Sequence, residues 1–394
     1  MIYLDNAATT PIRPEVLEAM MPYLTDSFGN PGAAYRLGRD AAAAVSNARK
    51  QVADFLNCEP EQIVFTSGAT EANNMVFQGV QQYLLDFNKT HIISSATEHK
   101  SILNALDALK TKDGFDVTLL SPTNGFCVDG HSLEGAITKE TGLVSVMYVN
   151  NEVGFCNPVV EIASICADND VLFHTDCVQA AGCFDLNVNE IGCDFMTVSS
   201  HKIGGPKGVG ALYIKDPCIM SPMIYGGDSQ EFGLRGGTEN VSSIVGFGEA
   251  CKIAKAGLKV NEALFRRQHH AFMMRFAQAM EARGYSGRDY MVNALKGSKA
   301  YKILSLTIPG IDAGTAQLML DVNGICVSTG SACNSSDNEP SHVLKAIGFS
   351  DDDARSTLRI SFSDDNTFLE IDDAAKELAT VIDVIKTGGV YDRI

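Results

Sequence analysis

Short apolar runs alternate with amphipathic stretches through the first two-thirds of the chain, and this alternation restricts the fold more than any other feature. Helical patterns lie at 70–86, 98–110 and 158–168, between runs that read as strands. Strands that alternate with helices pair in parallel, and the helices cover the sheet. We therefore expect an α/β domain on a mostly parallel, seven-stranded sheet, with strands at 62–67, 91–95, 116–121, 142–149, 171–176, 194–200 and 208–214.

A long helical pattern over 241–283 interrupts this rhythm. Strand candidates at 302–308 and 358–363 follow it, and a final helix begins with the capping box Thr367–Glu370 and ends at Gly388. These elements predict a second, smaller α/β domain, joined to the first by the long helix. We expect a large domain over 15–257 and a small domain made of 1–14 and 258–394.

Composition and charge exclude several classes of protein. The 394 residues, 45% of them hydrophobic, are enough for a large core. The formal net charge of −17 opposes docking on phosphates, so we expect no direct nucleic-acid binding. The start, MIYLDNAATTPIRPEV, lacks a basic segment followed by an apolar core, and no apolar run approaches the ~20 residues that span a bilayer. We expect a soluble, cytoplasmic protein without membrane contact.

The eleven cysteines are scattered and form no CxxC pair, which argues against a zinc or iron–sulfur site. Their odd number favours reduced thiols, most of them small buried hydrophobes. Cys333 differs, because it lies in STGSACNSSDNEPSHVL (328–344), a run of small polar residues typical of an exposed loop. Such a thiol is accessible to reaction partners.

A lysine follows one of the predicted strands, in TVSSHKIGGPKGVG (197–210). Lys202 stands at the carboxyl end of its strand, where α/β sheets bind ligands, and a desolvated amine can form a Schiff base. Taken alone, a solvated loop lysine is the simpler interpretation. Lys207 has similar local surroundings, so the segment does not choose between the two.

Two further segments point to a phosphorylated cofactor. In QIVFTSGATEANN (62–74) a strand meets a helix through small residues and hydroxyls, including Ala69 and Thr70, which suits a phosphate. Asp176 ends the strand in VLFHTDCVQAAG (171–182), where it can pair with a protonated ring nitrogen or simply cap the next helix. A phosphate site, a Schiff-base lysine and this aspartate together are what pyridoxal phosphate (PLP) requires.

Nine segments in order along the chain resemble the cysteine desulfurase family, whose members are PLP enzymes of fold type I in the class V aminotransferase superfamily. The resemblance extends from residue 3 to the region of Arg359 and is closest to the group with a long mobile catalytic-cysteine loop, here about 326–340. The segments are YLDNAATT (3–10), FGNP (28–31), FTSGATEANN (65–74), TEHKS (97–101), VNNEVG (149–154), HTDCVQ (174–179), SSHKIGGPKG (199–208), LRGGTEN (234–240) and GSACNSSDNEPSHVL (330–344).

The resemblance implies a role for each matching residue. Lys202 would form the Schiff base with PLP and move the substrate Cα proton, and Asp176 would pair with the pyridinium nitrogen. His99 would stack on the cofactor ring and shuttle protons, as an imidazole can near neutral pH. The remaining cofactor contacts implied are Asn151 and Gln179 at the phenolic oxygen, and Ala69, Thr70, Ser199 and His201 at the phosphate.

Three more residues match positions that concern substrate and partner. Thr238 matches a residue that reaches the phosphate of the partner subunit's cofactor, which implies a homodimer with shared active sites. Arg359 matches the arginine that binds the substrate carboxylate bidentately, although by itself it reads as a surface arginine on a strand. Asn30 is expected at the rim near that carboxylate, with Asn151 also near the substrate.

The resemblance implies the conversion of L-cysteine to L-alanine, with the sulfur passing to Cys333 as a persulfide and then to an acceptor protein. Three alternatives remain: a selenocysteine lyase or another class V lyase or transaminase, a scaffold or carrier that merely keeps the fold, and a specialised donor for nucleic-acid or cofactor sulfuration instead of iron–sulfur assembly. The last is favoured by the ending KTGGVYDRI, which has no clear counterpart of the long tail by which housekeeping members bind an iron–sulfur scaffold. The chain also departs from the family pattern at Tyr35, which concerns the pocket entrance or the dimer contact, and at Tyr225, Phe232 and Leu234.

Overall fold

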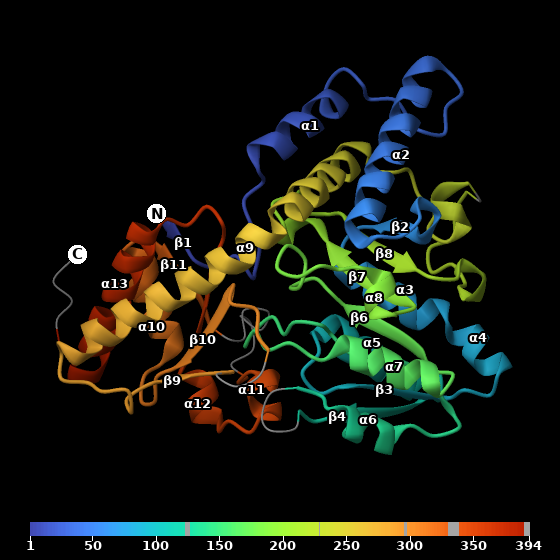
Figure 1. Ribbon diagram of the computed structural model, residues 1–394. Coiled ribbons are helices and arrows are strands. Elements are labelled where there is room, and N and C mark those ends of the chain that lie inside the picture. Colours follow the sequence, from blue (N-terminus) through green and yellow to red (C-terminus); the bar gives the residue numbers. More distant parts are fainter. Residues whose placement is uncertain (123–126, 228, 295–297, 330–338, 390–394) are drawn as a thin grey trace.

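The structure, a computed structural model, describes residues 1–122, 127–227, 229–294, 298–329 and 339–389 (Figure 1). Its centre is a seven-stranded sheet in which β8 alone runs antiparallel to its neighbours, among the described residues. The strand order is β2 (Ile63–Thr66), β8 (Gly210–Ile214), β7 (Phe195–Ser199), β6 (Leu172–Asp176), β5 (Thr141–Ser145), β3 (His91–Ser95) and β4 (Asp116–Leu120).

Helices cover both faces of this sheet, because alternate side chains of each strand point to opposite faces and both faces are apolar. On β2, for example, Ile63 and Phe65 belong to one hydrophobic core and Val64 belongs to another. The first core includes side chains of α2 (Arg36–Leu56), α7 (Val159–Asp168) and the start of α9 (Val241–Glu281). The second includes side chains of α3 (Ala69–Gly79), α4 (Gln81–Asp86) and α5 (Lys100–Lys112).

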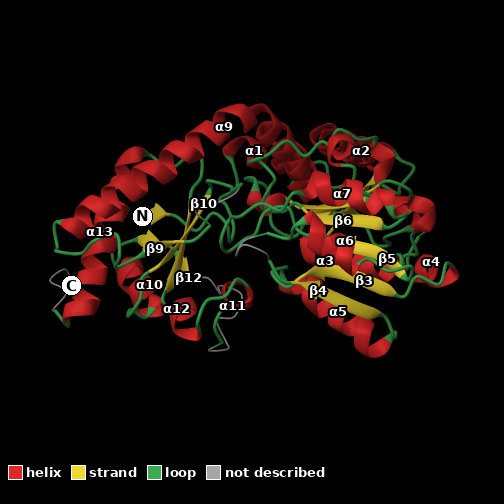
Figure 2. Cartoon of the chain, turned by 60° about the horizontal axis from the view of Figure 1, so that its bottom comes forward, coloured by secondary structure: helices red, strands yellow, loops and turns green. Residues whose placement is uncertain are grey.

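A second region packs around a four-stranded antiparallel sheet (Figure 2). Beside it, the start of the chain pairs with a later segment, since β1 (Ile2–Tyr3) runs parallel to β11 (Ile325–Cys326). Helices α10 (Ala313–Val322) and α13 (Phe368–Thr387) contribute to its hydrophobic core. The four-stranded sheet has the order β12 (Ser328–Thr329), β13 (Thr357–Ser361), β10 (Ile303–Thr307) and β9 (Met291–Val292).

Helix α9 joins the two regions (Figures 1 and 2). Phe247 and Ala250 in its first half lie in the core beneath the large sheet, whereas Phe272 and Phe276 in its second half lie in the core of the smaller region. The remaining helices are α1 (Pro14–Leu24), α6 (Gly130–Ala136), α8 (Val188–Ile191), α11 (His342–Ala346) and α12 (Asp351–Arg355), with short 3-10 turns at Pro60–Gln62, Ser200–Lys202, Pro217–Ile219 and Gln230–Gly233.

The predicted α/β architecture with its seven-stranded, mostly parallel sheet is confirmed, and so is the long helix, which ends two residues earlier than expected. The capping box of α13 is also present: Thr367 Oγ1 accepts from the Glu370 N–H, and the Thr367 N–H donates to Glu370 Oε2. The single helix expected over 70–86 is instead two helices, α3 and α4, which meet at Val80. The domain boundaries at 14 and 257 stay a prediction. Within the described residues, the structure contains no helix long and apolar enough to cross a membrane.

Candidate active site

A cavity of about 630 Å³ opens at the carboxyl ends of the parallel strands. The ends of β6 and β7 and the start of α3 form part of its wall. The carboxyl ends of the strands are the edge where α/β sheets bind ligands. The predicted site residues that line it are Ala69, Thr70, His99, Asn151, Asp176, Gln179, Ser199, His201, Lys202 and Arg359. One cavity therefore collects residues from positions 69 to 359.

The N-terminus of α3 supplies free hydrogen-bond donors to this cavity. Gly68 precedes the helix with φ of 150°, in a conformation that L side chains rarely adopt, and provides no side-chain cap. Within the described residues, no hydrogen bond reaches the N–H groups of Ala69 and Thr70. Unpaired N–H groups and the positive end of the helix dipole suit an anionic group such as a phosphate.

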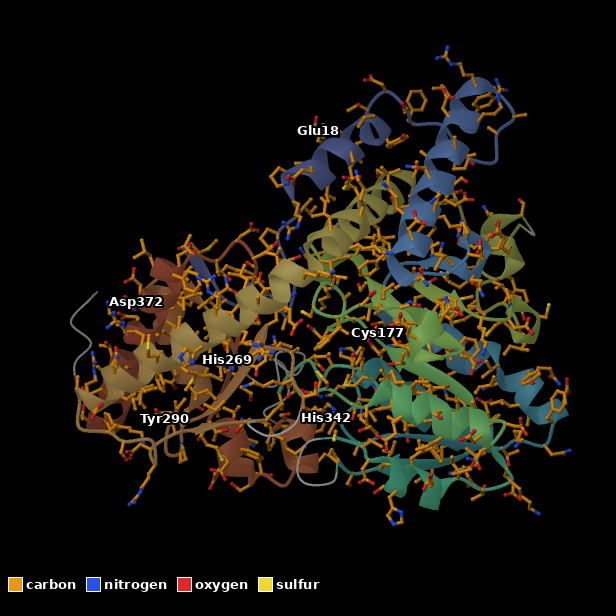
Figure 3. The ribbon with its side chains drawn as sticks, in the orientation of Figure 1. Glu18, Cys177, His269, Tyr290, His342 and Asp372 are labelled. Carbon is orange, nitrogen blue, oxygen red and sulfur yellow. The ribbon has the colours of Figure 1, made fainter. Side chains whose placement is uncertain are left out.

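Asp176 ends β6 with its carboxylate held by two donors. Its Oδ1 accepts from the Val178 N–H at 3.0 Å, and its Oδ2 accepts from Asn73 Nδ2 at 2.9 Å. The side chain lines the cavity and is nearly buried, and the following residue Cys177 is fully buried (Figure 3). The contact with Val178 closes a local turn, and within the described residues no helix begins there, so Asp176 is not the helix cap of the alternative interpretation.

His99 stands at the start of α5, where its imidazole caps the helix. Nδ1 accepts from the Ser101 N–H at 3.1 Å and lies 2.8 Å from Ser101 Oγ. Burial lowers the pKa of His99, while the nearby charge of Asp176 acts in the opposite direction. The ring lines the cavity, as stacking on a cofactor would require.

Lys202 and Lys207 both line the cavity, but they differ in exposure. Lys207 is exposed, whereas Lys202 is half-buried and its Nζ donates to the carbonyl oxygens of Ala7 at 2.6 Å and Ala8 at 2.9 Å. The structure therefore favours Lys202 as the amine that meets a cofactor inside the cavity.

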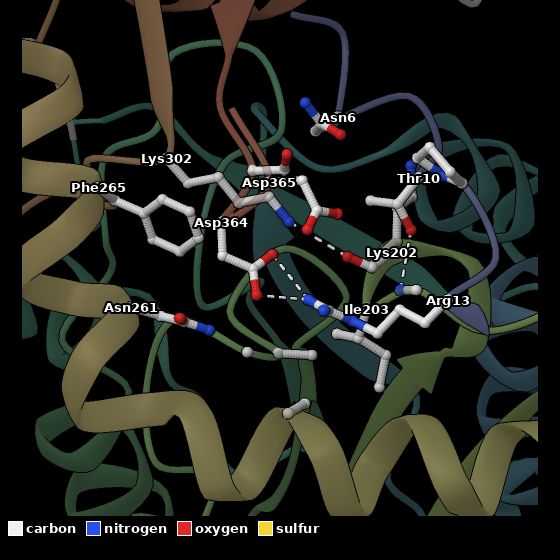
Figure 4. Close-up of a pocket in the computed structure, with 16 residues that line it drawn as sticks. Asn6, Thr10, Arg13, Lys202, Ile203, Asn261, Phe265, Lys302, Asp364 and Asp365 are labelled. Atoms are coloured by element: carbon white, nitrogen blue, oxygen red, sulfur yellow. Dashed lines mark hydrogen bonds and ion pairs between the residues drawn. The ribbon is translucent and has the colours of Figure 1, made fainter. Parts of the chain in front are cut away.

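A second, smaller cavity borders the turn that carries Lys202 (Figure 4). A polar side chain that lines it contacts the Lys202 backbone. Lys302 Nζ donates to the Lys202 carbonyl oxygen at 3.1 Å. In the same smaller cavity, Arg13 pairs with Asp364 at 2.5 Å. The Lys302 contact and the Arg13 N–H, which donates to the Gly204 carbonyl oxygen at 2.9 Å, hold the turn that carries Lys202.

Several polar groups around the cavity are oriented by the segment of residues 5–10. Gln179 Nε2 donates to the Ala7 carbonyl oxygen at 2.9 Å, which leaves its Oε1 buried and without a partner in the described chain. His201 Nδ1 lies 3.1 Å from Thr9 Oγ1, and burial lowers the pKa of His201 to about 4, with Lys202 and Lys207 adding to the effect. Ser199 is buried at the end of β7.

Arg359 lies on β13 of the small region, yet its guanidinium lines the cavity. Nη1 donates to the Asn151 carbonyl oxygen at 2.9 Å, and Nη2 donates to Asp5 Oδ1 at 2.8 Å. Its Nε is buried and has no partner within the described residues. A guanidinium held on two nitrogens in this way is oriented before any carboxylate binds.

Two predicted site residues do not line this cavity, and a third lies outside the described residues. Thr238 and Asn30 are exposed and do not line it, and Asn30 Oδ1 instead accepts from the Gly32 N–H at 2.9 Å. Cys333 lies outside the described residues. The roles inferred for these three residues stay predictions.

Sequence reasoning missed Asp5, Asn73 and Ser101, which hold Arg359, Asp176 and His99 respectively. All three lie inside the segments that carry the family resemblance, YLDNAATT, FTSGATEANN and TEHKS. Their position beside a predicted site residue was the available signal. What the sequence could not give was the direction of each side chain.

The cavity fits PLP in three independent respects. The unpaired N–H groups of Ala69 and Thr70 match its phosphate, Asp176 matches its ring nitrogen, and the unpartnered Oε1 of Gln179 marks a polar atom that awaits a ligand. Lys202 supplies the amine that a Schiff base needs. The residues present therefore fit this cofactor.

The chain is similar to known proteins over nearly its whole length. The family "Aminotransferase class-V" matches residues 2–373. The cysteine desulfurase IscS of Dictyoglomus turgidum is 38% identical over 391 residues, 99% of this chain and 96% of that protein. A solved structure described as a NifS-like protein has a TM-score of 0.87 at 32% identity, covering 97% of this chain and 99% of the other.

A second solved structure, described as SspA in complex with cysteine, is 36% identical with a TM-score of 0.77 and covers 92% of this chain and 99% of the other. Family match, relatives and solved structures extend over nearly the whole chain and point the same way. The chain belongs to the cysteine desulfurases of the class-V aminotransferase family.

Proposed function

We propose that this protein is a PLP-dependent cysteine desulfurase that converts L-cysteine to L-alanine and transfers the sulfur to Cys333. The observation that carries the proposal is the convergence of Lys202, Asp176, His99 and Arg359 on one cavity. The cysteine complex of the solved relative supports L-cysteine as the substrate. The names of the relatives do not favour a selenocysteine lyase or a scaffold without activity.

The residues of this chain divide the work by their positions. Arg359 binds the substrate carboxylate, and Lys202, whose amine lies inside the cavity, holds PLP and moves the Cα proton. Bound PLP supplies an electron sink for bond breaking next to Cα. Asp176 holds the ring-nitrogen proton, and the His99 imidazole lies where it can stack and shuttle protons.

The sulfur transfer balances without an external oxidant. A bond forms between Cys333 Sγ and the substrate sulfur while the carbon–sulfur bond of the substrate breaks. L-cysteine and the Cys333 thiol thereby become L-alanine and a Cys333 persulfide. The thiolate is the attacking form, so deprotonation of Cys333 must precede the transfer.

The Schiff base is tested by absorbance and product analysis. The protein loaded with PLP should show a band near 400 nm, roughly as expected for a protonated Schiff base, and should form alanine from L-cysteine. Lys202→Ala should lose both, whereas Lys207→Ala should keep the band. A band that survives in Lys202→Ala and disappears in Lys207→Ala would move the cofactor lysine to 207.

We also propose a homodimer in which Thr238 of one subunit reaches the cofactor site of the other. Thr238 is exposed and lies outside its own cavity, and apolar side chains are exposed on nearby parts of the chain. These include Leu17, Met21, Leu24, Phe28, Tyr35, Tyr225 and Phe232.

Mixed dimers test the shared site. Thr238→Glu should weaken cofactor binding across the interface, because its carboxylate repels the phosphate. Mixing inactive Thr238→Glu with inactive Lys202→Ala subunits should restore activity, since one site of each mixed dimer keeps both native residues. Lack of recovery in mixed dimers shown to form would contradict shared sites. The acceptor protein, the cytoplasmic location and the long catalytic-cysteine loop stay predictions.

A further inference from the structure

A chain of hydrogen bonds joins Asp176 to His99 through two residues without an assigned role. Asn73 Nδ2 lies 2.9 Å from Asp176 Oδ2 and 2.9 Å from Ser101 Oγ. Ser101 Oγ in turn lies 2.8 Å from His99 Nδ1. Asn73 comes from α3 and Ser101 from α5, so the chain connects two helices on one face of the sheet with the end of β6.

The direction of the first two bonds follows from chemistry. A carboxylate oxygen only accepts, so the atom of Asn73 that faces Asp176 must be the amide nitrogen. The same nitrogen also faces Ser101 Oγ. The two hydrogens of Asn73 Nδ2 are therefore donated to Asp176 Oδ2 and to Ser101 Oγ. Asn73 is fully buried, and its Oδ1 has no partner in the described chain, so no competing contact turns the amide around.

The remaining bonds then fix the imidazole. Because Ser101 Oγ accepts from Asn73, its own hydrogen is free to point to His99 Nδ1. The backbone N–H of Ser101 also donates to Nδ1, at 3.1 Å. Two donors on one ring nitrogen leave no place for a proton there, so neutral His99 carries its hydrogen on Nε2.

The surroundings of His99 oppose a second proton on the ring. The imidazole caps the N-terminus of α5, where the helix dipole is positive and disfavours a cation. Lys100, Lys202 and His342 add positive or partly positive charge, and Asp176 is the opposing carboxylate. Nε2 makes no hydrogen bond with the described part of the chain, and the ring lines the cavity.

We propose that Asn73 and Ser101 are positioning residues that hold His99 as its Nε2–H tautomer and connect it to Asp176 through hydrogen bonds of fixed direction. Asp176 is the expected partner of the ring nitrogen, and His99 is the imidazole expected to carry protons. The same two residues, Asn73 and Ser101, thereby orient both groups. The inference rests on the proposed function for its meaning, whereas its geometry is observed in this chain.

Nitrogen NMR of histidine tests this tautomer directly. The full-length protein is labelled with ¹⁵N-histidine, His99 is assigned with His99→Gln, and both ring nitrogens are followed through a pH titration with and without PLP. In the neutral wild type, Nδ1 should show the shift of an unprotonated nitrogen and Nε2 that of a protonated one. A protonated Nδ1 in the neutral ring would overturn the proposal.

Variants test the two positioning residues. Ser101→Ala removes one donor to Nδ1 and should raise the titration midpoint of His99 by about one pH unit, the size expected for one lost hydrogen bond. Asn73→Ala frees the Ser101 hydroxyl to turn and accept a hydrogen bond from a protonated Nδ1, which should raise the midpoint by a smaller amount. Ser101→Thr keeps the hydroxyl and should restore the wild-type value.

Asn74→Ala is the matched control, because Asn74 follows Asn73 in α3 but, within the described residues, its side chain donates to the carbonyl oxygens of Thr70 and Ser101 and not to a side chain. In this variant the titration midpoint of His99 should stay at the wild-type value. Unchanged midpoints in both Ser101→Ala and Asn73→Ala would remove these residues from any positioning role. A missing PLP absorbance would instead contradict the proposed function, and the nitrogen shifts of the cofactor-free protein would still decide the tautomer.

Discussion

Arg359 of β13 and Asp5, which follows β1 and bridges to Ser361, form an ion pair, with Nη2 lying 2.8 Å from Oδ1. The Arg359 side chain is 4% exposed and that of Asp5 is 19% exposed. A nearly buried guanidinium needs a counter-charge, and Asp5 supplies it from the start of the chain. The arginine expected to bind the substrate carboxylate therefore already has one carboxylate partner.

Asp5→Asn should lower the free energy of unfolding by about 2 kcal/mol, since it leaves the charge of Arg359 unbalanced while keeping an acceptor. A ligand carboxylate can then replace the missing charge. We expect L-alanine to raise the melting temperature of the PLP-loaded variant more than that of the wild type, as binding to the native state stabilises it. Thermal unfolding with and without L-alanine measures the difference.

Asp364→Asn is the control for this test, because it breaks the Arg13–Asp364 pair outside the cofactor cavity. It should also lower stability, but its response to L-alanine should equal that of the wild type. An equal response in Asp5→Asn as well would mean that the substrate carboxylate does not bind Arg359.

The pKa of Glu152 makes the stability of the folded protein depend on pH in a definite direction. Burial raises the pKa of Glu152 from 4.5 to about 7, against the hydrogen bond from Ser341 and the charges of Arg359 and Lys100. The folded protein therefore holds this proton more tightly than the unfolded chain does. Its contribution to stability is fully present below the unfolded pKa and is lost as the pH rises through 7.

Glu152→Gln should remove this loss of stability with rising pH. Between pH 5.5 and pH 7.5, the stability of the variant relative to the wild type should increase by about 2 kcal/mol, because each pKa unit corresponds to about 1.4 kcal/mol. Urea unfolding at the two pH values measures it. The exposed Glu161→Gln should show no such change, and parallel profiles for Glu152→Gln and the wild type would contradict the raised pKa.

Glu231 stabilises the edge strand of the large sheet. Its carboxylate pairs with Arg49 at 2.6 Å and accepts from the Phe65 N–H of β2 at 2.7 Å, and it is nearly buried. Glu231→Ala should lower the free energy of unfolding by about 3–5 kcal/mol, because Arg49 then stays buried without its partner. Chemical denaturation measures this loss.

The neighbouring pair Lys50–Asp54 is the matched control, since its side chains are 64% and 59% exposed. Asp54→Ala should cost less than about 1 kcal/mol, as exposed ion pairs do. Equal losses of unfolding free energy in Glu231→Ala and Asp54→Ala would show that burial does not decide how much the Arg49–Glu231 pair contributes to stability.

Much of the fold could be predicted from the sequence because its signals are local. Strands such as β2 and β8 are short apolar runs, and α13 carries both its capping box and its left-handed Gly388. The division of 70–86 into α3 and α4 was missed, since the sequence there keeps its helical pattern through Val80. Local pattern does not show where a helix changes direction.

The candidate site was predictable where a residue ends or follows a strand, as Asp176 and Lys202 do. The contacts that orient these residues come from far along the chain: Asp5 meets Arg359 across 354 positions, and Asn73 meets Asp176 across 103. Such pairs follow from how the sheets and helices pack, which single-sequence patterns do not specify. The choice between Lys202 and Lys207 likewise needed their exposures.

The central claim, that Cys333 receives sulfur released in the Lys202 cavity, is tested most directly by one measurement. The PLP-loaded protein is mixed with L-cysteine, and alanine, sulfide and the mass of the peptide containing Cys333 are determined together. Without added thiol we predict alanine with one added sulfur atom on Cys333. With dithiothreitol as the two-electron reductant we predict that the wild type releases sulfide and that Cys333→Ala loses this production. Full sulfide production by Cys333→Ala would contradict the account.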